Sequence, residues 1–429
     1  MNGRIWIVLY LFVWIITFFM YQKTKKDFDA GSLLIGSFVL YSASSLLLSY
    51  DTYWGANFED ITLFPFIYLY LMLMLAFSPI LKYSPKTIKR IEMPSKIIFN
   101  GFIFIFILCS LTKLINIIPN FVSGVTRIIF DSAAGLDMYH DTLIENEDIG
   151  NGTITNLPSI IANAMGDIGI LATFFYLSRP NHKRIIVIGL LLSCVVTILD
   201  ALAAAQRGPA IERLLVMLIT FIALKDFYSD KVREIAIRTG VVVVILISLP
   251  LVALTISRFD REEGGASAST FYYMGQQNLY FNSYALDDGG IRYGDRTIPV
   301  FKRMIGIANV PKNYIERRAK YPNLKINDDV FSSFVGDFTI DFGPVVAVVI
   351  FLVFSLYAIK HTKPIAGVLP FHRLLLLHFI MCICIQGSLK LYPYSDLGGN
   401  LKLIVFLLCY IAFKISYNQK VKSIYEKRY

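Results

Sequence analysis

The amino-acid sequence predicts an all-α polytopic membrane protein, and three of its properties lead to this fold class. Hydrophobic residues occupy 55% of the 429 positions, whereas charged residues occupy only 17%. The mean hydropathy is +0.58, and a soluble domain of this size would need more polar residues to cover its surface. The apolar residues gather in runs of about 20, the length at which a helix crosses a bilayer. We therefore expect a lipid bilayer as the environment and a single transmembrane domain over residues 1–429.

Eleven apolar runs predict about eleven transmembrane helices. They lie at roughly 4–21, 30–50, 61–81, 97–118, 157–178, 184–205, 209–226, 239–257, 334–359, 373–392 and 399–417. The first run has no small-residue cleavage site and is followed by Lys23, Lys25 and Lys26. We therefore expect a retained first helix and not a cleaved signal peptide.

The charge of the connections predicts how the helices are oriented. Lysine and arginine fill the connections after the first, third, fifth, seventh and ninth runs and the segment after the eleventh, whereas acidic residues fill 119–156. Because basic connections stay in the cytoplasm, the N-terminus is expected outside and the C-terminus inside, which requires an odd number of spans. The formal net charge of +10 is then mainly a topology signal, and we expect no nucleic-acid partner.

The five cysteines and five histidines form no pattern that indicates a disulfide framework or a metal site. All cysteines lie inside apolar runs, and Cys382 and Cys384 are too close in sequence for the usual zinc spacing. Nucleotide-binding, hydrolase and metalloprotease motifs are also absent from the sequence. We therefore expect neither a metal nor another cofactor.

The turn between the sixth and seventh runs carries an arginine where the orientation rule would not place one. In DALAAAQRGPA, residues 200–210, Arg207 precedes Gly208 and Pro209. Glycine permits close approach of a ligand, proline favours the first turn of a helix, and a helix N-terminus attracts anions. Arginine also binds phosphate in a bidentate way. The sequence thus predicts a phosphate or diphosphate site here, and the alternative is an arginine that only extends to the membrane surface.

Two carboxylates inside apolar runs are further candidates. Asp200 precedes Arg207 by two helical turns, which would place both on one helix face, and Asp167 lies in the fifth run. A carboxylate in a membrane is costly and usually faces a cavity or a partner. For both, a catalytic role and a structural ion pair remain open.

Segment 257–333, between the eighth and ninth runs, predicts a long loop on the outer side. Its stretches 297–310 and 311–320 have the pattern of short amphipathic helices. Arginine and tyrosine suit a sugar diphosphate, because guanidinium groups bind phosphate and rings stack on sugars, although an interfacial aromatic belt with lipid contacts is the alternative. The candidate ligand-binding residues of this loop are Arg258, Arg261, Arg292, Arg296, Tyr272 and Tyr273.

The stretch NDDVFSSFVGDFTIDFGPVVAVVI, residues 327–350, enters the ninth run from outside. Asp337 and Asp341 are four residues apart and therefore share a helix face. Gly336, Gly343 and Pro344 allow close packing or a local kink. A carboxylate at this boundary is a candidate general base, and the alternative is a helix with a polar end.

The layout and two short motifs resemble a known family. The turn AAAQRGP, the long arginine-rich outer loop and the stretch FSSFVGDFTIDFGPVVAVV are similar to those of bacterial O-antigen polymerases of the Wzy type, the oligosaccharide repeat unit polymerases. The resemblance extends over the chain from about the fifth to the ninth run, and Arg207 matches the arginine that this family carries after a middle span.

The resemblance implies a fold similar to type-C glycosyltransferases in the bacterial inner membrane, with the active site facing the periplasm. The implied reaction polymerises oligosaccharide repeat units on undecaprenyl diphosphate into O-antigen or capsule-like polysaccharide, with inversion and without metal. Lipid-linked oligosaccharides would be both donor and acceptor, with a chain-length regulator protein as a further partner. Arginine would stabilise the leaving diphosphate, and Asp337, Asp341 or Asp200 would act as the base.

Two alternative functions remain open. An O-antigen ligase has a similar architecture and differs mainly in its acceptor. A flippase or transporter of lipid-linked oligosaccharide would show internal repeats and charged residues in the middle of the membrane. The sequence shows no such repeat, and its polar residues gather near the outer ends of the runs, which favours an enzyme.

Overall fold

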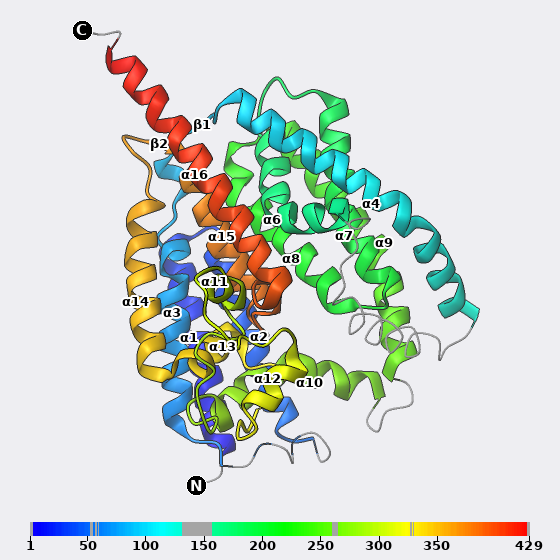
Figure 1. The fold of residues 1–429 in the computed structure, drawn as a ribbon, viewed down its shortest axis with the longest axis vertical. Coiled ribbons are helices and arrows are strands. Elements are labelled where there is room, and N and C mark those ends of the chain that lie inside the picture. The colour runs from blue at the N-terminus through cyan, green and yellow to red at the C-terminus, as the bar shows by residue number, and fades with distance from the viewer. Residues whose placement is uncertain are drawn as a thin grey trace. The chain divides into compact units, whose positions relative to one another are not determined.

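The computed structural model describes residues 3–51, 55, 58, 60–130, 157–259, 265–326, 328 and 330–426. Over these ranges the chain is mostly helical, and one small parallel sheet pairs β1 (Arg90–Glu92) with β2 (Val368–Pro370), as Figure 1 shows. The chain divides into two compact units, which are described separately. The first comprises Met1–Tyr83, Ser267–Lys363 and Phe379–Ile404, and the second comprises Ser84–Ala266, Pro364–His378 and Val405–Tyr429.

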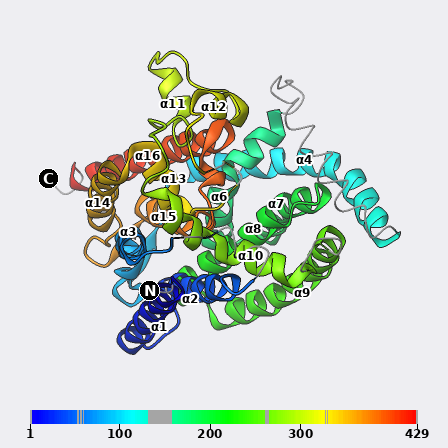
Figure 2. The same cartoon turned by 90° about the horizontal axis from the view of Figure 1, so that it is seen from below.

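The first unit is built around aromatic side chains. The ring centroid of Trp14 lies 5.0 Å from that of Phe38, which lies 5.5 Å from that of Phe77. The helix α14 runs beside α3 within this unit (Figure 2). The helices of the unit are α1 (Arg4–Lys25), α2 (Ala30–Leu48), α3 (Leu63–Leu81), α10 (Gly265–Tyr280), α11 (Pro299–Met304), α12 (Tyr314–Lys320), α13 (Ser333–Phe342) and α14 (Pro344–His361), with the short turns η5 (Phe281–Ala285) and η6 (Tyr392–Tyr394).

The second unit packs α4 against both α6 and α7. Gly169 on α6 makes this packing close, because a Cβ atom there would lie only 2.3 Å from the ring of Phe106 on α4. The elements of this unit are β1, α4 (Lys96–Phe130), α6 (Leu157–Leu177), α7 (Arg184–Ala203), α8 (Arg207–Leu224), α9 (Asp230–Phe259) and β2, with the short turns η2 (Pro85–Thr87) and η4 (Lys225–Phe227). The residues of α15 (Phe371–Gln386) and α16 (Asp396–Glu426) are divided between the two units, and the first two residues of α10 belong to the second.

Nine helices of the described chain are long and apolar enough to cross a membrane, and they coincide with nine of the eleven predicted runs. The two other runs are also helical, but α8 carries Arg207, Glu212 and Arg213, and α15 has only 16 residues. The chain is therefore a multi-pass helical membrane protein, and the total of eleven spans stays a prediction.

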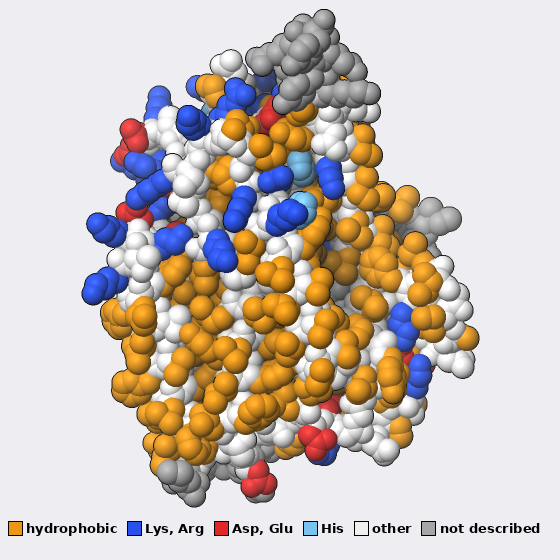
Figure 3. Space-filling view, turned by 90° about the vertical axis from the view of Figure 1, so that its left-hand side faces the viewer, with side chains coloured by type: hydrophobic (Ala, Val, Ile, Leu, Met, Phe, Trp, Pro, Cys, Tyr) orange, Lys and Arg blue, Asp and Glu red, His pale blue; other side chains and the backbone are white. Residues whose placement is uncertain are grey.

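Hydrophobic side chains on the outer surface of the first unit agree with this class. Val345, Val349 and Val353 follow one another at intervals of one turn along α14, and all three are exposed. Figure 3 shows a broad hydrophobic area on the face that it draws. An apolar area of this extent indicates contact with lipid tails, because proteins surrounded by water rarely expose such large apolar patches.

The predicted ninth run, 334–359, is not one helix. It is broken between α13 and α14 at Gly343, whose φ of 81° lies in the left-handed region that glycine adopts without strain. Pro344 then occupies the first turn of α14, where its missing N–H is tolerated. Only α14 is long enough to span, and α13 is a separate buried helix.

The segment between the eighth and ninth predicted runs contains the two short helices that the sequence predicts, with different limits. The first, α11, covers only Pro299–Met304 of the predicted 297–310. The second, α12, begins at Tyr314 and not at Pro311, because the Asn313 side chain caps it by accepting a hydrogen bond from the Glu316 backbone N–H, at 2.9 Å.

Candidate functional site

A buried arginine–aspartate cluster lies in the first unit and contains four of the predicted site residues. Its members are Arg292, Arg296, Arg317, Asp328, Asp337, Asp341 and Asp396. We call this set the arginine–aspartate cluster. Three guanidinium groups face four carboxylates, so the positive charge of the arginines is balanced inside the protein.

Two short segments build the centre of the cluster. Asp337 and Asp341 lie one turn apart on α13, as predicted from their spacing. Arg292 and Arg296 do not lie on a helix but on a turn, in which Tyr293 has a φ of 53°. The backbone N–H of Arg292 donates to the Ile340 carbonyl at 3.1 Å, which holds this turn against α13.

The ion pairs within the cluster are short. Arg292 Nε lies 2.6 Å from Asp341 Oδ1, and one of its terminal nitrogens lies 2.7 Å from Asp328 Oδ1. Arg296 contacts Asp337 Oδ1 at 2.8 Å. Although burial lowers the pKa of a guanidinium group, the carboxylates of Asp337 and Asp328 hold the pKa of Arg296 above its ordinary value.

The two carboxylates of α13 also bind the backbone of distant segments. Asp337 Oδ2 accepts a hydrogen bond from the Leu391 N–H at 2.7 Å, and Asp341 Oδ2 accepts one from the Thr297 N–H at 2.7 Å. Both side chains are 0% exposed. A general base must reach the proton that it removes, and a fully buried carboxylate does not contact a substrate. The geometry of Asp337 and Asp341 therefore suits groups that hold the loop together.

Three members of the cluster, Arg317, Asp328 and Asp396, are not among the site residues predicted from the sequence. Arg317 on α12 contacts Asp328 Oδ2 and Asp396 Oδ1, each at 2.6 Å, and thereby joins the loop to the start of α16. Arg317 lies in the stretch PKNYIERRAK, where its charge suggested only a polar helix face. Its burial follows from tertiary packing, which no local pattern reveals.

A second ionic group covers the edge of the same loop. The buried carboxylate of Asp295 accepts hydrogen bonds from Lys320 Nζ at 2.6 Å and from the Tyr321 hydroxyl at 2.8 Å, and it is also paired with Lys302. Burial alone would raise the pKa of Asp295, but the hydrogen bonds from Lys302, Lys320 and Tyr321 lower it below its usual range.

We expect the cluster to make the folded loop sensitive to acid. Burial alone would raise the pKa of Asp328, but Arg296, Arg292 and Arg317 lower it from 3.8 to about 2. Because the folded pKa lies below the unfolded one, Asp328 contributes stability above pH 4 that is lost as the pH falls towards 2, about 2 kcal/mol in all. Unfolding measured in detergent from pH 6 to pH 2.5 should show this loss in the wild type and less of it in Asp328→Asn. Equal pH slopes in the two proteins would contradict the assignment.

Asp200 lies in the second unit, near the end of α7, where Lys113 is a partner that the sequence did not predict. Lys113 of α4 donates a hydrogen bond to Asp200 and another to Asn163 Oδ1 of α6, the latter at 2.7 Å. Lys113 is buried, whereas the side chain of Asp200 keeps 44% of its surface exposed. Among the three predicted catalytic carboxylates, Asp200 is thus the one that a substrate can reach.

Arg207 does not share a helix with Asp200, so the prediction that both lie on one helix face is wrong. The helix α7 ends at Ala203, Ala205 has a φ of 51°, and α8 begins at Arg207. The turn is closed by a 2.8 Å hydrogen bond from the Gln206 N–H to the Ala201 carbonyl. Arg207 stands in the first turn of α8 and donates to the Thr255 hydroxyl of α9 at 3.2 Å.

A small hydrophobic core holds this turn in place. Ala205 and Ala210, on either side of Arg207, are buried together with Leu202 of α7 and Leu254 of α9. The backbone of the turn is therefore packed against α9 while Arg207 itself is only partly buried. The packing fixes a positively charged side chain at the N-terminus of α8, where the helix dipole is also positive.

Asp167 has its partner within the helices. Arg213 of α8 donates to Asp167 at the midpoint of α6, and both side chains are buried. His378, near the middle of α15, lies with Nε2 2.8 Å from the Asp167 carbonyl oxygen and with Nδ1 3.3 Å from the Thr220 hydroxyl. Of the two alternatives left open for Asp167, the structure shows the ion pair, and it lies midway along α6 and not near an outer end.

The remaining predicted residues are placed as follows. Tyr272 and Tyr273 lie on α10, where the Tyr272 hydroxyl is 3.1 Å from that of Tyr280 and the Tyr273 ring is 5.5 Å from the Phe331 ring. Arg258 belongs to the last turn of α9, and Arg261 lies outside the described residues.

Within the described ranges, His, Cys, Asp and Glu side chains form no group of three or more that could hold a metal ion. Comparison with protein-family models, with curated proteins and with solved structures finds no match to this chain.

Proposed function

We propose that the protein joins lipid-diphosphate-linked oligosaccharide repeat units into a polysaccharide by glycosyl transfer, with Asp200 as the general base. One observation carries this proposal. Asp200 is a half-exposed carboxylate held by the buried Lys113, one tight turn before the N-terminus of α8. A carboxylate and a cationic helix end are the two groups that this reaction needs.

The proposed roles follow from the charge that moves in the reaction. Asp200 takes the proton of the acceptor hydroxyl group while the oxygen forms a bond to the anomeric carbon of the donor. The bond from that carbon to the lipid diphosphate breaks, and the electron pair leaves with the diphosphate. Arg207 and the first N–H groups of α8 stabilise the negative charge that develops there.

The arginine–aspartate cluster has a different role under this proposal. Arg292 and Arg296 are buried and balanced by carboxylates, so binding a diphosphate would require them to give up their internal partners. We assign them to folding of the outer loop. The resemblance of AAAQRGP to repeat unit polymerases supports Arg207 as the anion-binding arginine instead.

Replacing Arg207 tests the proposal. We expect Arg207→Ala to lower polymer formation roughly a hundredfold, because one preorganised cationic donor to the leaving group is lost. Arg207→Lys should recover little, since an ammonium group cannot reproduce bidentate phosphate binding. The measurement is the glycan ladder made by the purified protein in liposomes from lipid-linked repeat units. Arg233→Ala, an exposed arginine at the start of α9, is the matched control, and unchanged chain lengths in Arg207→Ala would contradict the proposal.

Transport of lipid-linked oligosaccharide is a second candidate, and the Asp167–Arg213 pair favours it. Charged side chains in the middle of membrane helices are costly and often mark a transport pathway. A strain that lacks the protein distinguishes the two functions by the membrane face on which lipid-linked repeat units accumulate. Single repeat units that accumulate on the periplasmic face indicate a missing polymerase, and units that accumulate on the cytoplasmic face indicate a missing transporter.

A further inference from the structure

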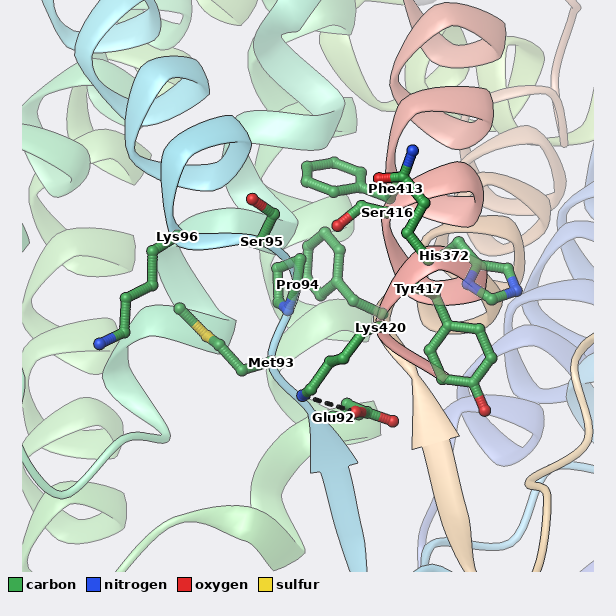
Figure 4. A pocket seen from close by; sticks show the side chains of 12 residues that line it. Glu92, Met93, Pro94, Ser95, Lys96, His372, Phe413, Ser416, Tyr417 and Lys420 are labelled. Atoms are coloured by element: carbon green, nitrogen blue, oxygen red, sulfur yellow. Dashed lines mark hydrogen bonds and ion pairs between the residues drawn. The ribbon is translucent and has the colours of Figure 1, made fainter. Parts of the chain in front are cut away.

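A cavity of about 570 Å³ lies in the second unit, and neither Asp200 nor Arg207 is among the residues that line it. It lies where β1 leads into α4 and where β2 leads into α15, beside the C-terminal part of α16 (Figure 4). Side chains from all three helices line it, among them Lys96, Phe371, His372, Phe413, Tyr417 and Lys420.

The small sheet explains why two helices start at this cavity. The strands are parallel, with Glu92 opposite Pro370 at their carboxyl ends. Phe371 begins α15 directly after β2, and Lys96 begins α4 a few residues after β1. Because parallel strands end at the same edge, the N-termini of both helices meet there. Their unpaired N–H groups and dipoles favour an anion.

The lining combines apolar and charged side chains. Phe371 and Phe413 pack edge to face with ring centroids 4.9 Å apart, and Met93 and Pro94 extend the apolar wall. The charged part includes Lys420, whose Nζ lies 2.7 Å from Glu92 Oε1, and Figure 4 shows this pair between β1 and α16. The Lys420 side chain is 52% exposed and that of Glu92 is 17% exposed, so the lysine can be reached from solvent.

The segments around the cavity are rich in positive charge. Lys89 directly precedes β1, Arg90 begins β1, Arg373 follows His372, and Lys414 lies on α16. Several of these residues lie in the basic connections that the orientation rule assigns to the cytoplasm. Anionic lipids are enriched in the cytoplasmic leaflet, and they attract lysine and arginine side chains near its surface.

We propose that this cavity binds the headgroup of an anionic phospholipid from the cytoplasmic leaflet. The phosphate group lies at Lys420 and the N-termini of α4 and α15, and the glycerol and upper acyl carbons contact Phe371, Phe413 and Met93. The apolar wall, in a cavity at the ends of membrane helices, distinguishes a lipid from a free phosphate ion. Glu92 competes with the lipid phosphate for Lys420, which makes the affinity depend on both residues.

Two substitutions with opposite expected effects on lipid affinity test this assignment. Lys420→Ala is expected to weaken binding of phosphatidylglycerol about fivefold, since one lysine near an anionic surface contributes about that factor. Glu92→Gln is expected to strengthen binding, because it removes the carboxylate that competes with the phosphate for Lys420. Lys231→Ala, an exposed lysine in the first turn of α9, is the control and should bind like the wild type.

The readouts are native mass spectrometry of lipid adducts and thermal unfolding of the full-length protein in detergent, with phosphatidylglycerol, phosphatidylcholine or inorganic phosphate added. Stabilisation by phosphatidylglycerol alone, lost in Lys420→Ala and increased in Glu92→Gln, supports the proposal. Equal binding in all variants overturns it. Equal stabilisation by inorganic phosphate overturns the lipid assignment, and destabilisation of both variants with no dependence on lipid shows that the Lys420–Glu92 pair is only structural.

Discussion

Asp200→Asn is expected to reduce polysaccharide formation roughly a thousandfold, the largest effect on activity that we predict. The asparagine amide keeps the size of the side chain but cannot accept the proton of an attacking hydroxyl group, and a positioned base typically contributes that factor. The measurement is the rate of glycan polymerisation in liposomes. Single-turnover rates should fall with little change in the concentration of lipid-linked substrate that gives half the maximal rate.

A control separates this loss from misfolding. Asp200→Asn leaves the buried Lys113 without its counterion, which costs stability. The double variant Asp200→Asn, Lys113→Met removes both charges and should fold better than the single variant while staying inactive. Asp230→Asn, an exposed aspartate at the start of α9, should behave as the wild type. Full activity in a folded Asp200→Asn protein would rule out Asp200 as the base.

Arg292→Met is expected to lower the free energy of unfolding by about 3–5 kcal/mol, the largest effect on stability that we predict. Arg292 is 1% exposed and contacts the carboxylates of Asp328 and Asp341 at 2.7 and 2.6 Å. Its removal leaves these buried charges with fewer partners. The loop should then become accessible to protease, which limited proteolysis and thermal unfolding in detergent can measure.

Matched variants distinguish this structural role from substrate binding. Lys312→Met removes an exposed positive charge from the same loop and should have little effect. The double variant Arg292→Met, Asp341→Asn removes one positive and one negative charge and should recover part of the lost stability. If Arg292→Met instead folds as stably as the wild type and loses only diphosphate binding, Arg292 is a ligand-binding residue.

The membrane helices could be predicted from sequence because hydropathy is a local property. Nine of the predicted runs are membrane-length helices in the described chain, and the two short loop helices lie within the stretches predicted for them. The break at Gly343 was foreseen only as a local kink. It separates α13 from α14 because a left-handed φ followed by proline cannot continue a helix.

The candidate site could be predicted only in part. Asp337, Asp341, Arg292 and Arg296 are conspicuous in the sequence, but nothing local shows that the two aspartates are the partners of the two arginines. Lys113 was missed because a lysine near the end of an apolar run also suits a side chain that extends to the membrane surface. A charged residue inside a predicted span was the available signal.

By itself, the sequence determined the class of this protein, the position of its apolar helices and the residues able to carry charge in or near the membrane. These properties depend on neighbouring residues, and the length and composition of each run are sufficient to predict them. Only the tertiary structure decided which charges neutralise each other and which stay accessible. Asp341 is buried against Arg292 and Asp200 is half exposed beside Lys113, because partners far apart in the chain are brought together by packing and not by any local pattern.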